Sequence, residues 1–174
     1  YLTALPHSGC YRFLGLSHPL NRWLCTMQWK IYLSGEIHSP WREEIATGIQ
    51  QNGLPVDIYA PVTDHDASDN CGVEILGNES DPFWKDRRGA GVNAIRTRTL
   101  IERADVVVVR FGNKYRQWNA AFDAGIAVTL GKPLITLHDE ELDHALKEIN
   151  AAACATARSP EQVVKILEYV IRST

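Results

Sequence analysis

The chain has 174 residues, enough for one domain with a buried core, and its 45 % hydrophobic and 22 % charged residues are ordinary for a globular protein. Its net charge of −3 gives no basic field for nucleic acid or an acidic membrane surface, and no apolar run approaches the roughly 18 residues that span a bilayer. The four cysteines lack metal-ligand spacing, which argues against a structural zinc site and favours reduced thiols in a cytoplasmic protein.

Residues 1–26 differ from the rest of the chain. They contain two arginines, no acid and no strand or helix period, and Met27 stands just before the first predicted strand. We expect 1–26 to be an N-terminal extension and 27–174 to be the structural domain. An Arg-bearing, acid-poor segment is compatible with a targeting remnant or with an extension that has no role. The lack of an amphipathic pattern favours the second.

The first half of the domain contains two predicted strands. Alternating apolar residues predict strands at 29–34 and 55–61, with a helix between them that begins near Ser39 and ends at Gly53. The stretch 62–90 is rich in Asp, Asn, Gly and Ser and predicts a long irregular excursion. Excursions of that length inside a compact domain are usually functional or mobile.

The second half continues the alternation of helices and strands. The run "DVVVVRF" is typical of a strand that is buried on both faces of a parallel sheet. The last helix opens on a capping box at Ser159. The predicted elements are helix 91–104, strand 105–111, a helix at roughly 115–130, strand 132–138, helix 141–149, a short edge strand at 151–157 and the final helix.

Five strands alternating with helices predict a three-layer α/β fold, flavodoxin- or Rossmann-like, with a parallel sheet in the order 2-1-3-4-5. The first strand is not followed by GxGxxG, and the chain has no GxxxxGK[ST]. Ordinary dinucleotide-binding and P-loop functions therefore lose support.

Ligands of open α/β sheets bind at the carboxyl ends of the strands. Residues expected at those ends are Tyr32, Ser34, Gly35, Glu36 and Asp64, and Arg96 is expected on the helix that leads into the third strand. Arg96 would suit a phosphate or carboxylate, or it is a surface charge. The group Asp64, His65, Asp66 and Asp69 has ligand types for a metal, but it equally suits a solvated, turn-forming loop.

The helix after the third strand carries polar residues within an apolar sequence. Asn119 and Asp123 are four residues apart and share one helix face, and Gln117 stands near the helix start. Asp123 therefore either faces a ligand or pairs within the fold.

The chain from Met27 onward resembles the YtoQ family. The segments that carry the resemblance include "WKIYLSGEIHSPWREEI", "APVTDHDASDNCGVEILG" and "RFGNKYRQWNAAFDAGIAVTLGKPLI". That family is in turn similar to the nucleoside 2-deoxyribosyltransferases. In those enzymes a glutamate in an E-x-G-x-A pattern attacks C1′ of a deoxyribosyl group and forms a glycosyl ester. The resemblance places Asp123 at that position and Tyr32 at the aromatic residue of the first-strand loop.

This sequence departs from the transferase pattern at three places. Asp123 replaces the glutamate, which sets the carboxylate back by about 1.5 Å. Gln117 and Thr97 occupy the places of two transferase aspartates. The fold and the position of the pocket therefore carry over better than deoxyribosyl transfer does.

The resemblance implies a nucleoside 2-deoxyribosyltransferase-like protein that cleaves or transfers an N-glycosidic bond of a nucleoside or nucleotide. Asp123 would be the nucleophile, without metal or organic cofactor, and a homo-oligomer is expected because such transferases complete their pockets with a neighbouring subunit. The alternative is a non-catalytic module that binds a nucleotide or phosphosugar through Arg96 and the first-strand loop. A weaker alternative is a metal-dependent hydrolase built on Asp64, His65, Asp66 and Asp69.

Overall fold

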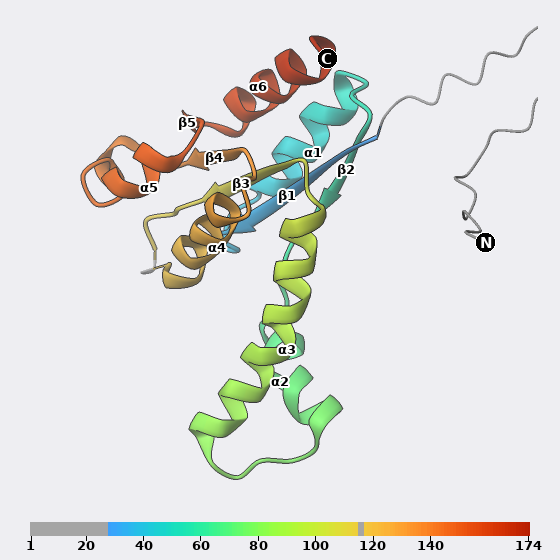
Figure 1. Cartoon of the computed structure of the whole chain (residues 1–174), viewed down its shortest axis with the longest axis vertical. Coiled ribbons are helices and arrows are strands. Elements are labelled where there is room, and N and C mark those ends of the chain that lie inside the picture. The colour runs from blue at the N-terminus through green and yellow to red at the C-terminus, as the bar shows by residue number, and fades with distance from the viewer. Residues whose placement is uncertain (1–27, 115–116) are drawn as a thin grey trace, which may run out of the picture.

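Five strands form one parallel sheet in the order β2-β1-β3-β4-β5, which confirms the predicted topology. The computed structural model describes residues 28–114 and 117–174 (Figure 1). The predicted extension 1–26 lies outside these residues. The elements are β1 (Trp29–Gly35), α1 (Trp41–Gln51), β2 (Val56–Tyr59), α2 (His65–Leu76), α3 (Pro82–Arg103), β3 (Val106–Arg110), α4 (Trp118–Thr129), β4 (Leu134–Leu137), the 3-10 helix η1 (Glu140–Leu142), α5 (Lys147–Ala152), β5 (Ala155–Ala157) and α6 (Pro160–Arg172).

Helices cover both faces of the sheet. On one face, Leu33 of β1 packs in a core with residues of α1 and α6. On the other face, Tyr32 of β1 packs in a second core with residues of α3 and α4. Because side chains alternate along a strand, Ser34 lies on the same face as Tyr32. The end of β1 therefore presents Ser34 toward α4.

The prediction of an irregular excursion over 62–90 is wrong. Residues 65–76 form α2, and α3 begins at Pro82 rather than near residue 91. The two helices form an arm, residues 65–90, that extends beyond the sheet (Figure 1). They approach each other closely at two glycines: a Cβ on Gly72 would lie only 2.8 Å from Cα of Gly89. The arm was missed because its helices pack mainly on each other and need only a narrow apolar stripe.

Other boundaries differ by smaller amounts. The helix predicted at 141–149 is divided into η1 and α5, and the strand predicted at 151–157 begins only at Ala155. None of the helices in the described ranges combines the length and the hydropathy needed to cross a bilayer.

Candidate functional site

The carboxylate of Asp123 lies against the end of β1. Asp123 is half-buried on α4, and the hydroxyl of Ser34, itself 1 % exposed, donates a hydrogen bond to its Oδ2 atom. Burial raises the pKa of Asp123, and the Ser34 hydrogen bond opposes part of that rise. An acid drawn out of water and oriented by one hydroxyl is an arrangement found at reactive carboxylates.

Tyr32 adds a buried hydroxyl to the same place. Its side chain is fully buried, and its hydroxyl makes no hydrogen bond of acceptable geometry to any described residue. Burial, followed by the negative charge of Asp123, raises the pKa of Tyr32 to about 12. The nearby Thr97 hydroxyl and the charges of Arg96 and Arg42 oppose this rise. A buried hydroxyl in this position could donate a hydrogen bond to a ligand or accept one from it.

The segment after Ser34 is shaped by a glycine. Gly35 has φ of +103°, and a Cβ there would lie 2.9 Å from the carbonyl carbon of Arg110 and closer still to its oxygen. Both the conformation and the space require glycine. Glu36 follows: its amide donates to the Arg110 carbonyl at 3.1 Å, and its carboxylate accepts from the His38 amide and the Ser39 hydroxyl. Both the backbone amide and the carboxylate of Glu36, a residue only 7 % exposed, are therefore held by hydrogen bonds within the fold.

Gln117 and Asn119 have different surroundings. The side-chain amide of Gln117 folds back on Gly112, accepting from its N–H at 3.1 Å and donating to its carbonyl at 3.4 Å. Gln117 thereby fixes the loop after β3. Asn119 is exposed on α4, one helical turn before Asp123.

The remaining predicted site residues lie on or beside the arm. Asp64 caps α2 by accepting from the amide of Ala67 at 3.2 Å. Arg96 donates to the carbonyl of Ala60, just past the end of β2, at 2.9 Å. Arg98 instead pairs with Glu102 at the surface, so of the two arginines only Arg96 lies near the site. In the described ranges, no three His, Cys, Asp or Glu residues form a group that could hold a metal ion.

Sequence analysis did not single out Arg42. Its guanidinium donates to three carbonyls that surround Ser34: Leu33 at 3.1 Å, Gly35 at 2.9 Å and Glu36 at 2.7 Å. It also lies 4.5 Å from the centre of the Trp41 ring. One sequence signal was available, since a cation in the first turn of a helix opposes the helix dipole.

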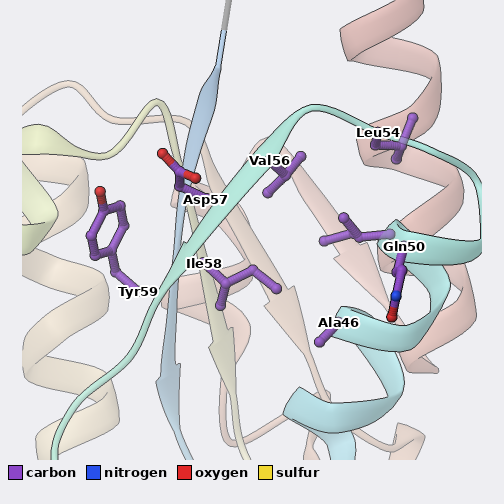
Figure 2. A pocket seen from close by; sticks show the side chains of 8 residues that line it. Ala46, Gln50, Leu54, Val56, Asp57, Ile58 and Tyr59 are labelled. Carbon is purple, nitrogen blue, oxygen red and sulfur yellow. The ribbon is translucent and has the colours of Figure 1, made fainter.

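The structure also has a groove at the β2 edge of the sheet, apart from these residues. It has a volume of about 610 Å³ and runs between α1 and the edge strand β2. Figure 2 shows Val56 and Ile58 pointing from β2 toward Ala46 and Gln50 of α1, whereas Tyr59 points to the other side of the strand. None of the predicted site residues lines this groove. We therefore place the candidate site at Asp123, beside the side chains of Ser34 and Tyr32.

Comparisons with known proteins agree with this fold. Residues 32–171 match the family model described as "Nucleoside 2-deoxyribosyltransferase YtoQ". The chain is 42 % identical over 147 residues to "Uncharacterized protein YtoQ" of Bacillus subtilis (strain 168), covering 84 % of this chain and 99 % of that protein.

Two solved structures are also similar. A conserved protein from Enterococcus faecalis V583 aligns with a TM-score of 0.55 at 15 % identity, covering 82 % of this chain and 99 % of that one. A 2-deoxyribosyltransferase from Bacillus psychrosaccharolyticus aligns with a TM-score of 0.48 at 16 % identity, covering 78 % and 90 %. The family model spans most of the domain, and the chain belongs to the YtoQ family of nucleoside 2-deoxyribosyltransferase-like proteins.

Proposed function

We propose that this protein cleaves or transfers the N-glycosidic bond of a nucleoside or nucleotide, with Asp123 as the nucleophile. The observation that carries the proposal is the contact of Asp123 with the Ser34 hydroxyl beside the buried phenol of Tyr32. The position at the carboxyl end of β1 is where open α/β sheets bind small molecules. Membership of the YtoQ family supports the same class of substrate.

The proposed reaction proceeds in two steps. One carboxylate oxygen of Asp123 forms a bond to C1′ of the sugar while the bond from C1′ to the base nitrogen breaks. The base leaves with the bonding electron pair and takes a proton from water. In the second step an acceptor base or water attacks C1′, loses a proton and releases the Asp123 carboxylate.

Ser34 has a defined part in this scheme. Its hydroxyl donates to Oδ2 of Asp123, which leaves Oδ1 as the attacking atom. The same hydrogen bond lowers the pKa of the carboxyl against the effect of burial, and so favours the ionised form that can attack. Tyr32 would donate its hydroxyl hydrogen to a sugar oxygen, because its pKa of about 12 keeps it protonated at neutral pH.

Base exchange tests the proposal. Purified protein is incubated with 2′-deoxynucleosides or their 5′-monophosphates and a second base, and products are separated by liquid chromatography. Asp123→Ala should abolish turnover while binding measured by calorimetry persists, because only the covalent step needs the carboxylate. Asp86→Ala, which removes an exposed acid of α3, is the matched control. Equal turnover in the wild type and Asp123→Ala would remove Asp123 from the mechanism.

Arg96 favours a second candidate function. Its guanidinium lies at the end of β2, close enough to Tyr32 to influence the phenol. A module that only binds a nucleotide or phosphosugar would use this cation for the phosphate. Such a module would bind 5′-monophosphates more tightly than nucleosides, lose that preference in Arg96→Ala, and show no exchange of bases.

The proposal includes self-association through the outer face of α4. Trp118 and Phe122 are four residues apart, 71 % and 67 % exposed, and Asp123 is the only charged residue of the helix. Exposed aromatic residues on an uncharged helix face are typical of an interface. Light scattering should show that Phe122→Glu dissociates an assembly that the control Tyr169→Glu, a lone exposed aromatic on α6, leaves intact. A monomeric wild type would refute this part.

A further inference from the structure

We use the name β1 loop for residues 33–36, which are the last three residues of β1 and Glu36 after it. Residues 33–35 pair with β3, and Ser34 carries the hydroxyl that contacts Asp123. Beyond the pairing with β3, the Glu36 amide donates to the Arg110 carbonyl, and the Glu36 carboxylate accepts from the Ser39 hydroxyl. The carbonyls of Leu33, Gly35 and Glu36 all turn toward one side chain, that of Arg42. A single guanidinium thus ties together both sides of Ser34.

Arg42 occupies this place against local preference. It lies in the first turn of α1, where the helix dipole disfavours a cation, and the acids Glu43 and Glu44 follow it. Its pKa is lowered by burial, so the charge is held in a poorly solvated position. Residues that break a local rule in this way are expected at functional sites.

The indole of Trp41 completes the arrangement. Its Nε1 donates to the Glu36 carbonyl at 2.7 Å, and its ring stacks against the guanidinium. The planar fork of arginine suits several acceptors and an aromatic face at once, whereas a lysine offers one point charge. The shape of the group, and not only its charge, therefore fits the loop.

We infer that Arg42 is a positioning residue that fixes the β1 loop and thereby holds the Ser34 hydroxyl against Asp123. The catalytic part of this inference rests on the proposed function. The role of Arg42 in fixing the loop does not, because it is argued from the three carbonyl contacts, which add to the pairing of residues 33–35 with β3. A loop released by about 1 Å would cost on the order of 100-fold in turnover.

Three variants test the inference: Arg42→Ala, Arg42→Lys and the control Arg98→Ala, which removes a surface arginine that pairs with Glu102. Hydrogen exchange of peptides covering residues 33–36 reports on the loop, and base exchange reports kcat and KM. We expect Arg42→Ala to exchange the Glu36 amide faster and to lose about 100-fold in kcat with little change in KM. Methylguanidinium should restore part of that kcat. Arg98→Ala should match the wild type.

Each remaining outcome also decides the inference. The inference would be overturned if Arg42→Ala kept the kcat of the wild type, whether or not hydrogen exchange of residues 33–36 became faster. If Arg42→Ala does not fold, Arg42→Lys takes its place, and wild-type loop exchange and kcat in that variant would overturn the inference. If the wild type turns over no nucleoside, the proposed function fails separately. In that case the positioning role would be overturned if hydrogen exchange of residues 33–36 were the same in the Arg42 variants as in the wild type.

Discussion

Replacing Gly35 by alanine should damage the fold and the site together. Two costs follow from the structure. The residue has φ of +103°, and a side chain in a positive-φ conformation costs roughly 1–2 kcal/mol. The new Cβ would lie 2.9 Å from the carbonyl carbon and 3.0 Å from the nitrogen of Arg110, closer than real Cβ contacts. The backbones must separate, which breaks the 3.1 Å bond from the Glu36 amide to Arg110 and costs about 1 kcal/mol more.

The sum is about 2–3 kcal/mol of unfolding free energy, or a fall in Tm of roughly 4–12 °C at 2–4 °C per kcal/mol. Gly53→Ala is the matched control, because Gly53 also has positive φ, +59°, but no atom lies within 4 Å of the Cβ position. Urea unfolding of both variants should show a loss of only about 1 kcal/mol for the control. If Gly35→Ala is as mild as Gly53→Ala, the close approach of β1 and β3 is not as described.

Three further predictions concern Asp123 and the arm. Ser34→Ala removes a hydrogen bond that lowers the pKa of Asp123, so the acid limb of kcat/KM should move to higher pH; an unmoved limb would contradict the proposed role of Ser34. Burial raises the folded-state pKa of Asp123 above its unfolded value. The folded state therefore favours the neutral carboxyl of Asp123. The stability that this preference contributes is present at low pH and is lost as the pH rises through the folded-state pKa. Asp123→Asn should therefore be more stable than the wild type at pH 8 in urea unfolding, and the gap should close toward pH 4. In the arm, a Cβ on Gly72 would meet the backbone of Gly89 whereas one on Gly91 meets nothing, so calorimetry should show a lower Tm for Gly72→Ala and a Tm at or above that of the wild type for Gly91→Ala.

The sheet was predictable from the sequence because its signals are local and strong. The apolar run that became β3 could only be a strand buried on both faces, and the alternation of strands and helices fixed the parallel order. The arm was not predictable in the same way. Its helices depend on a close approach between Gly72 and Gly89, and a contact between two glycines far apart in sequence leaves no periodic signal.

The place of Asp123 in the fold was predictable, but its contacts were not. The position of Asp123 on the helix after the third strand placed it at the carboxyl edge of the sheet. Its contact with Ser34 depends on the alternation of side chains at the end of β1 and on how α4 packs there. The side chain of Gln117 turns back to Gly112 because the loop offers an unpaired N–H and carbonyl. Such pairings are decided by three-dimensional contacts that residue spacing does not encode.

The central claim is that Asp123 forms a covalent bond to the sugar. Protein mixed with a 2′-deoxynucleoside labelled in the sugar is quenched in acid, digested and examined by mass spectrometry. The mechanism predicts the label as an ester on the peptide that contains Asp123, absent in Asp123→Ala and present in the control Asp86→Ala. Base exchange without any labelled peptide, or label that persists in Asp123→Ala, would contradict it.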